Sequence, residues 1–229
     1  MPAWDDSPNA RQLQHLEQAL GLPQAGLTRQ WLDDELLALW LMTLENPELQ
    51  MDAAAIGRFW QTLPYWAFAW AGGRGLARFI QQNPQHLVGR RVLDFGCGSA
   101  IAGVAAAIAG ADAVYVCDLD PNALQAAAVN AALNGIELIP VRSGEPWPEV
   151  DLLLAADVLY DNSSHDPLAE LTRRIPELLL AETRGMTPAV AGIRCLETLE
   201  TSTLPAIGDF DQAVTVDVYG RLHGAPALN

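Results

Sequence analysis

The sequence predicts an α/β fold built on a doubly wound, mostly parallel sheet. From residue 90 onward, short apolar segments that read as strands alternate with segments of helical spacing. The strand expected over 91–95 runs into a glycine-rich turn, and the strand expected over 113–117 ends on an acidic residue. Alternating strands and helices are typical of parallel sheets with right-handed crossovers, and such sheets bind ligands at the carboxyl ends of their strands.

The remaining elements after residue 90 are expected to follow one another with short connections. Asp166-Pro167 marks the start of the last helix, because an acidic residue and a proline favour the first turn. Helices are expected over 100–109, 121–133 and 166–182, and strands over 137–142, 151–156, 188–194 and around 213–219. The tail, 197–229, is short for an antiparallel hairpin that would complete the sheet. The last strand is therefore not assigned a neighbour.

The first 62 residues are expected to form a helical cap rather than a separate catalytic domain. Leucines at helical spacing predict one helix over 9–20 and another over 27–45, which Pro47 ends. A third helix is expected over 51–62. Residues 63–229 are expected to form one structural unit that carries the ligand site.

Length and composition bound the class of protein. With 229 residues, half of them hydrophobic, the chain is long enough for one domain that buries roughly 70% of its unfolded surface. Its three cysteines are scattered and read as reduced thiols, and no pattern of metal ligands is recognised. The acidic N-terminus does not resemble a signal peptide, and the apolar runs are too short to span a bilayer. We therefore expect a cytoplasmic protein with no metal and no membrane segment.

The net charge of −15 argues against nucleic acid as a substrate. Phosphate binding relies on clustered basic residues, and all 13 basic residues here are arginines, gathered only into pairs such as Arg90-Arg91 and Arg173-Arg174. The charge serves either solubility or attraction of a cationic partner, and both interpretations stay open. We expect a monomer.

The glycine-rich turn carries the first functional motif. Gly96 and Gly98 allow a tight turn and a close approach of the backbone to a ligand. A dinucleotide fingerprint would need a third glycine where Ile101 stands, so that interpretation is rejected. With Asp94 two residues before the first glycine, the D-x-G-x-G pattern resembles that of the S-adenosylmethionine (SAM) methyltransferases, although Ala100 replaces their usual third glycine.

This resemblance implies a class I methyltransferase, with a Rossmann-like sheet of about seven strands and SAM as cofactor. In that superfamily the acid at Asp94 helps to hold the ammonium end of the methionine moiety; the alternative is a strand-end cap. Asp118 follows the second strand, where an acid accepts hydrogen bonds from ribose hydroxyls, and Leu119 would then lie against the adenine. Asp120 is the competitor for the ribose, but Asp120-Pro121 looks more like the cap of the next helix.

Two further segments supply candidate cofactor contacts. Ser143 and Trp147, with Gly144 between them, follow the third strand, where this fold contacts the adenine amine. Trp66 and Trp70 precede the flexible Gly72-Gly73, and they form either a packing surface for the cap or an aromatic wall beside the ligand. From these segments Trp70, Gly72, Ser143 and Trp147 are assigned to the cofactor site.

The fourth strand of the sheet delivers Asp157 and Tyr160 to the edge where the methyl acceptor would approach. This D-x-x-Y pattern resembles the protein lysine methyltransferases of the seven-stranded class. Together with the aromatic segment around Tyr65 and Trp70, it is most similar to the lysine methyltransferases of the electron transfer flavoprotein β subunit. The resemblance covers roughly residues 58–175, and leaves out most of the cap and the tail.

The resemblance implies transfer of a methyl group to a lysine of a protein, with the electron transfer flavoprotein β subunit as the candidate substrate. A lysine amine must be neutral to attack, and its ordinary pKa is about 10.4. A carboxylate nearby raises that pKa, so Asp157 is expected to capture and orient the amine rather than to deprotonate it. Tyr160 would accept a hydrogen bond from the amine or pack its stem. Alternatively, Asp157 only caps a strand and Tyr160 belongs to the core.

Two other functions compete with this one. A small-molecule amine N-methyltransferase would use an acid at the same strand end, with the cap closing the pocket. A SAM-binding module without catalysis is the third possibility, and the complete set of acidic and glycine positions argues against it.

Overall fold

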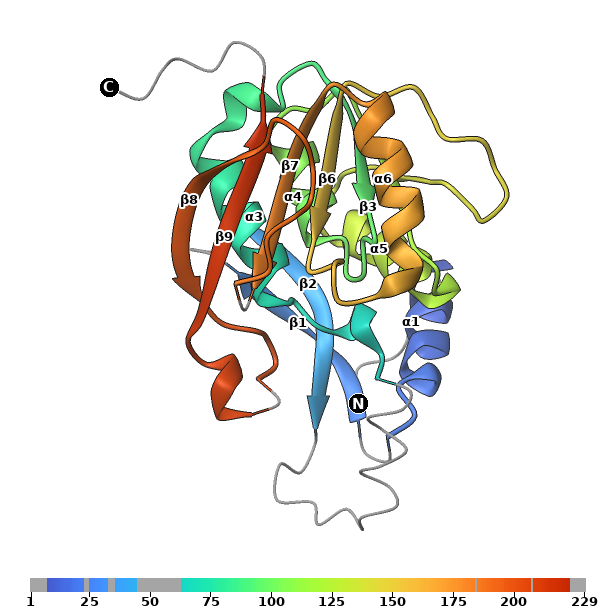
Figure 1. The fold of residues 1–229 in the computed structure, drawn as a ribbon. Helices are drawn as coiled ribbons and strands as arrows, with labels where there is room; N and C mark the ends of the chain where they lie inside the picture. Colours follow the sequence, from blue (N-terminus) through green and yellow to red (C-terminus); the bar gives the residue numbers. More distant parts are fainter. Residues whose placement is uncertain are drawn as a thin grey trace.

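The computed structural model describes residues 8–22, 25–32, 36–44, 63–183, 185–206 and 208–222, and its centre is a seven-stranded sheet of order β5–β4–β3–β6–β7–β9–β8 (Figure 1). The strands are β3 (Arg91–Phe95), β4 (Ala113–Cys117), β5 (Ile139–Pro140), β6 (Leu152–Ala156), β7 (Glu177–Thr183), β8 (Arg194–Thr201) and β9 (Val214–Arg221). The five strands from β3 to β7 are parallel, and β9 runs antiparallel to both β7 and β8. The predicted α/β class with its mostly parallel sheet is confirmed.

Apolar side chains on both faces of the sheet hold the helices against it. On β7, Leu179 and Ala181 pack in one cluster with α3 (Ala71–Gln82) and α4 (Ile101–Ile108). The alternate residues, Leu178 and Leu180, pack on the other face with α6 (His165–Arg174). The helices therefore cover both faces (Figure 1), as the near-continuous apolar runs of parallel strands require.

The segment predicted as a helix over 27–45 is an antiparallel hairpin, so this prediction is wrong. It comprises β1 (Ala25–Leu32) and β2 (Leu37–Leu44), paired from Ala25 with Leu44 to Leu32 with Leu37. Leu37, Leu39 and Leu41 alternate along β2 and are all fully buried, whereas Leu36, which also fitted the helical spacing, is 55% exposed. The period-2 pattern therefore decides the structure of this segment.

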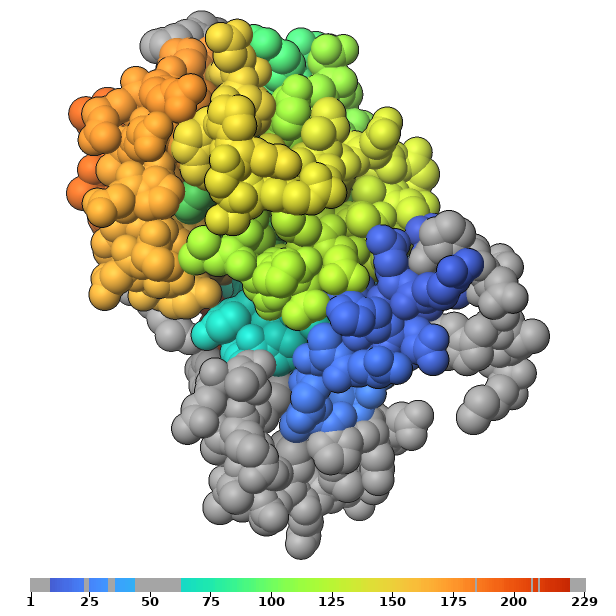
Figure 2. Space-filling model, turned by 90° about the vertical axis from the view of Figure 1, so that its right-hand side faces the viewer, coloured from blue at the N-terminus to red at the C-terminus, as the bar shows by residue number. Residues whose placement is uncertain are grey.

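The helix predicted over 9–20 is confirmed as α1 (Pro8–Ala19), and the helix predicted over 51–62 lies outside the described residues. Leu16 and Leu20 pack with residues of α5 (Pro121–Leu133). Figure 2 shows α1 and the hairpin (blue) beside α5 (yellow-green), with the segment after residue 62 (cyan) next to them. The described part of the cap is thus a helix with a hairpin.

Two boundaries near the end of the sheet also differ from prediction. The helix expected over 166–182 ends at Arg174, because Pro176 cannot continue it, and the apolar run that follows forms β7 instead. No strand forms over 188–193; β8 begins at Arg194 and pairs with β9 as the antiparallel hairpin that the sequence left unassigned. The strand predicted around 213–219 is β9, and the strand predicted over 137–142 is shortened to β5.

Two asparagines on successive turns of α5 fasten the hairpin to the domain. The Asn134 side chain accepts a hydrogen bond from the Ala38 amide at 2.9 Å and donates one to the Ala38 carbonyl at 2.7 Å. Asn130, fully buried, accepts from the Trp40 amide at 2.8 Å and donates to the Ser99 carbonyl at 2.9 Å. Asn130 therefore joins β2, α5 and the glycine-rich turn.

Replacement of Asn130 by leucine should destabilise the protein markedly. The nearly isosteric side chain leaves the Trp40 amide and the Ser99 carbonyl without partners, which costs about 3 kcal/mol. Thermal unfolding should show a Tm lower by about 10 °C. Asn162→Leu, at an exposed position, is the matched control and should leave the Tm nearly unchanged. Equal effects of the two substitutions would contradict the role given to Asn130.

Candidate functional site

A cavity of about 1490 Å³ opens at the carboxyl ends of the parallel strands. The chain leaves β3 in one direction through β4 and β5 and returns to β6 on the other side, and open α/β sheets form their ligand crevice at such a reversal. The predicted site residues that line the cavity are Trp70, Asp94, Gly96, Gly98, Asp118, Leu119, Ser143, Trp147, Asp157 and Tyr160. Residues far apart in the sequence are thus brought together.

The glycine-rich turn needs left-handed backbone at three positions. Gly96 and Gly98 have φ values of 67° and 52°, and a Cβ on Gly96 would lie 2.8 Å from a methyl group of Val158. Ala100, with φ of 60°, adopts the same conformation where the family motif has glycine. The departure costs about 1–2 kcal/mol, the usual price of this conformation for a residue with a Cβ.

Asp118 and Asp120 both line the cavity, but their carboxylates have different hydrogen-bond partners. The Asp118 carboxylate accepts hydrogen bonds from the amides of Gly98 and Asp120, both at 2.9 Å. Burial raises the pKa of Asp118, and these backbone donors oppose the rise. Asp120 instead caps α5, since its side chain accepts from the Asn122 amide at 2.8 Å. The capping interpretation of Asp120 is confirmed.

Asp94 is a buried carboxyl that faces the cavity. Asp94 is only 2% exposed, and its carboxyl accepts a hydrogen bond at 2.9 Å from the Gly103 amide in α4. Burial raises the pKa of Asp94 to about 7. A cationic group of a ligand placed here would favour the ionised form and lower that pKa.

Asp157 is held from two sides at the end of β6. Its backbone is left-handed, with φ of 50°, and its carboxylate accepts hydrogen bonds from the Gly72 amide at 2.7 Å and the Thr183 hydroxyl at 3.0 Å. Gly72 is not a lining residue: it lies against Asp157, where a Cβ would come within 2.5 Å of the carboxylate. Gly72 therefore fixes Asp157.

Aromatic rings form a wall beside Asp157. The rings of Tyr65 and Tyr160 are stacked, with centroids 5.7 Å apart, and the Tyr65 and Trp70 centroids are 5.5 Å apart. The Trp70 indole also donates to the Tyr65 carbonyl at 2.9 Å. Trp66, by contrast, is 2% exposed and packs among residues of α1 and α5, although it also borders the cavity.

Among the cavity residues that sequence reasoning did not assign to the site are Tyr65, Glu182 and Thr183. Glu182 and Thr183 were hidden because the helix predicted over 166–182 concealed the end of β7. The signal that could have identified them was an acid and a threonine directly after an apolar run, which is typical of the end of a buried strand. Glu182 is 3% exposed, and burial, followed by the charge of Asp157, raises its pKa to about 7.

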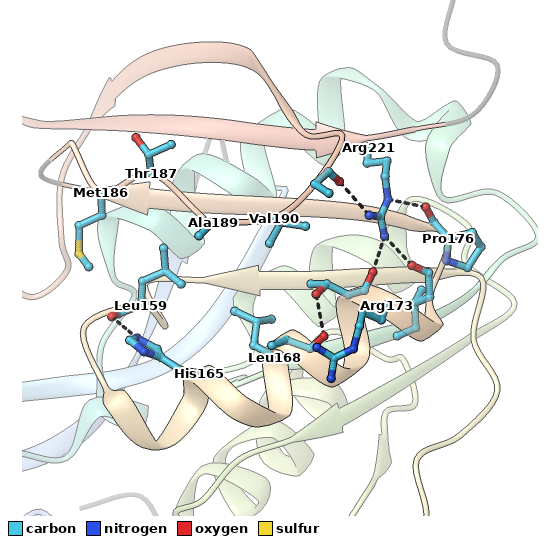
Figure 3. Close-up of a pocket in the computed structure, with 14 residues that line it drawn as sticks. Leu159, His165, Leu168, Arg173, Pro176, Met186, Thr187, Ala189, Val190 and Arg221 are labelled. Atoms are coloured by element: carbon cyan, nitrogen blue, oxygen red, sulfur yellow. Dashed lines mark hydrogen bonds between the residues drawn. The ribbon is translucent and has the colours of Figure 1, made fainter.

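A second cavity, of about 790 Å³, lies between α6 and the segment 186–191 (Figure 3). The Arg221 guanidinium at one end of it donates hydrogen bonds to four backbone carbonyls, those of Thr172, Ile175, Pro176 and Ala191. These bonds fasten β9 to the end of α6. None of the predicted site residues lines this cavity, so the candidate site is the larger one.

Two features, a cluster of metal ligands and a membrane-spanning helix, are absent from the residues that the structure describes. No group of three or more His, Cys, Asp or Glu side chains in those ranges is arranged to hold a metal ion. No helix in the same ranges has the length and apolar character needed to cross a membrane.

The family model described as Ribosomal protein L11 methyltransferase (PrmA) matches residues 78–193, which include the glycine-rich turn and both strand ends that carry Asp118 and Asp157. The chain belongs to this methyltransferase family. The match covers half of the chain, from α3 to the end of the segment after β7. The fold and the family together imply SAM as the methyl donor.

Individual relatives support the same class. The electron transfer flavoprotein beta subunit lysine methyltransferase of Danio rerio is 38% identical over 129 residues, 54% of this chain and 46% of the relative. The ribosomal protein L11 methyltransferase of Dichelobacter nodosus is 33% identical over 194 residues, 78% of this chain and 63% of the relative. The chain spans about half the length of the lysine methyltransferases it matches.

A solved structure gives independent support for the fold. It comes from Pyrococcus horikoshii, is described as a proposed RNA methyltransferase, and aligns with a TM-score of 0.51 at 15% identity. The alignment covers 65% of this chain and 81% of that one. At this identity the likeness concerns the fold alone.

The residues of the cavity fit SAM. A buried carboxyl at Asp94 suits a cationic ammonium group, and Asp118 suits a pair of hydroxyls. The turn between them brings the backbone of Gly96 and Gly98 to the lining of the cavity, and neither residue adds a side chain there.

Replacement of Asp94 by asparagine should make the protein less sensitive to pH. Because the folded pKa is about 7 and the ordinary value is 3.8, the folded state binds the proton more tightly, and ionisation costs stability as the pH rises between these values. The stabilisation of Asp94→Asn over wild type should be near zero at pH 4 and reach about 4 kcal/mol above pH 8.

Chemical denaturation without ligand, repeated from pH 4 to pH 8.5, measures this difference. Asp112→Asn, at an exposed position at the opposite end of the sheet, is the matched control and should show a flat difference. SAM binding by Asp94→Asn should be weaker than that of wild type. A pH-independent difference between Asp94→Asn and wild type would contradict the burial argument.

Proposed function

We propose that this protein is a SAM-dependent N-methyltransferase that transfers a methyl group to a lysine side chain of a protein substrate. One observation carries the proposal: two acids suited to binding the cofactor and a site suited to binding an amine line the same cavity. Asp94 and Asp118 form the first, and Asp157 with the stacked Tyr65 and Tyr160 forms the second.

In this proposal the cofactor lies across the ends of β3 and β4. Asp94 holds the ammonium of the methionine moiety, and the backbone of Gly96 and Gly98 runs along the ligand. Asp118 accepts from the ribose hydroxyls, and Leu119, 71% exposed within the cavity lining, covers the adenine.

Four further residues complete the proposed cofactor site. Trp147, whose ring centroid lies 6.3 Å from that of Phe95, borders the adenine together with Ser143. Trp70 lines the opposite side, between the cofactor and the acceptor. Gly72 contributes indirectly through the hydrogen bond that it donates to Asp157.

The acceptor site is proposed to orient the amine rather than to activate the methyl group. SAM supplies a sulfonium methyl that is already electrophilic, so the protein mainly aligns the nucleophile, the methyl carbon and the leaving sulfur. Asp157, fixed by the Gly72 amide and the Thr183 hydroxyl, binds the amine. The Tyr65 and Tyr160 rings pack along the lysine stem and exclude water.

The substrate is proposed to be the electron transfer flavoprotein β subunit. Support comes from the relatives of that name, which are 32–39% identical to this chain in vertebrates. Ribosomal protein L11 is the competing protein substrate, because the family model carries its name. A small-molecule amine is the remaining alternative. The net charge of −15 favours a cationic acceptor in each case.

A monomeric state and a cytoplasmic location are proposed with this function. They rest on the composition and the scattered free cysteines, of which Cys97 and Cys117 are buried thiols.

Labelled SAM should transfer its methyl group to the electron transfer flavoprotein β subunit of the source organism. The purified β subunit, ribosomal protein L11 and a set of free small amines are incubated separately with the enzyme, and mass spectrometry identifies the methylated residue. Label on a lysine of the β subunit supports the full proposal. Label on L11 alone would replace the substrate, and label confined to small amines would overturn the protein acceptor.

Replacement of Asp157 by alanine should abolish transfer while cofactor binding persists. Loss of the carboxylate removes the group that orients the amine, so kcat/KM should fall about 100-fold or more. Calorimetry should show a Kd for SAM within about threefold of wild type. The control is Asp112→Ala, at an exposed residue far from the cavity. Unchanged transfer by Asp157→Ala would exclude the assigned role.

A further inference from the structure

A second carboxyl group lies beside Asp157, and the proposed mechanism leaves it unused. Glu182 is at the end of β7, in the strand next to β6, where the Asp157 amide donates to the Ala181 carbonyl at 3.0 Å. Glu182 is 3% exposed and lines the same cavity as Asp157 and Tyr160. A buried acid in this place needs an explanation, because ionisation of a buried carboxyl is costly.

The backbone fixes the orientation of Glu182. One carboxylate oxygen, Oε1, accepts hydrogen bonds from the amides of Val158 and Leu159, at 3.2 and 3.3 Å. These amides belong to the turn that follows Asp157. The Glu182 side chain is therefore held at the turn that follows β6. The next residue, Thr183, points to the opposite face of β7, where its hydroxyl donates to Asp157.

Neighbouring groups are poor candidates for taking a proton near neutral pH. Desolvation of the phenol raises the pKa of Tyr160, so it stays protonated. The hydrogen bonds that Ser163 donates lower the pKa of Asp161, which makes this carboxylate a weak base. Burial and the charge of Asp157 hold the pKa of Glu182 at about 7, the range in which a general base is effective.

We propose that Glu182 is a further catalytic residue, the general base that removes a proton from the acceptor ammonium before methyl transfer. The inference rests on the proposed N-methyltransferase function and deepens it. Asp157 binds the ammonium, and Glu182 takes one proton from it. The nitrogen lone pair then forms the new C–N bond, the C–S bond breaks with its electron pair going to sulfur, and the Glu182 proton passes to solvent.

Several titratable groups surround Glu182 and act on the same proton. Those that share the cavity with it are Tyr65, Asp94, Cys97, Cys117, Asp118, Asp120, Arg142, Glu145, Asp157, Tyr160, Asp161 and Asp211. On β9, its register partner is Asp217, whose carboxylate accepts from the Thr198 hydroxyl. Among them, the charge of Asp157 raises the pKa of Glu182 and so favours the proton on Glu182 once it has left the amine.

The test is Glu182→Gln, which keeps a carbonyl oxygen for the Val158 and Leu159 amides but cannot accept a proton. In wild type, kcat should rise with pH up to about pH 7 and then level off, because the base must be ionised. In Glu182→Gln, kcat at pH 7 should fall about 100-fold or more, and the inflection near pH 7 should disappear. Glu200→Gln, at an exposed position on β8, is the matched control.

A second acceptor separates proton removal from positioning. The target lysine is replaced by cysteine and alkylated to aminoethylcysteine, whose amine loses its proton more readily than lysine. The defect of Glu182→Gln should shrink at least tenfold with this acceptor. An equal defect with both acceptors, or an unchanged kcat and pH profile with lysine, would overturn the proposal. Loss of SAM binding in Glu182→Gln would also overturn it.

If Glu182→Gln does not fold, Glu182→Asp replaces it. This variant keeps a carboxylate and should retain a pH inflection with a reduced kcat; absence of the inflection would overturn the proposal. Failure of the proposed function is distinguishable, because it appears as absence of lysine methylation by wild type. If wild type methylates a small amine instead, the same variants and pH profiles test Glu182 on that amine.

Discussion

The reversal of strand order between β3 and β6 is the constraint on which the rest of the structure depends. Every strand of the parallel part ends at one edge of the sheet, so the residues that follow each strand meet there. Asp118 follows β4, Asp157 follows β6 and Glu182 ends β7. No single segment contains the site; the topology assembles it from strand ends that lie up to about 90 residues apart, counted from Asp94 to Glu182.

Burial then gives these acids different properties although their chemistry is the same. Asp120 and Asp161 are exposed enough to act as local caps, and they hold backbone amides of their own turns. Asp94 and Glu182 are withdrawn from water, so their carboxyls titrate near neutrality. Burial alone does not separate the roles of these two acids. Asp94 is proposed to meet a cationic group, which favours its ionised form, whereas Glu182 is proposed to exchange a proton.

Sequence patterns predicted those parts of the molecule that depend on neighbouring residues. The turn around Gly96 and the cap at Asp120 are encoded within a few positions, and both were recognised. The β1–β2 hairpin was missed, because leucines at 32, 36, 37 and 41 fit a helical period, while those at 37, 39 and 41 fit an alternating one. The hydrogen bond from Gly72 to Asp157 joins residues 85 positions apart, and no local pattern records it. Glu182 was missed because an apolar run after a helix looks the same whether the helix continues or a strand begins.

Asn130 connects the N-terminal hairpin to the ligand pocket. Its side chain bonds to the Trp40 amide of β2 on one side and to the Ser99 carbonyl of the glycine-rich turn on the other. A ligand that orders this turn strengthens the attachment of the hairpin, and linkage makes the effect reciprocal. The hydrogen-exchange rate of the Trp40 amide would thus report whether the pocket is occupied. A partner that binds the hairpin would change the affinity for the ligand without entering the pocket.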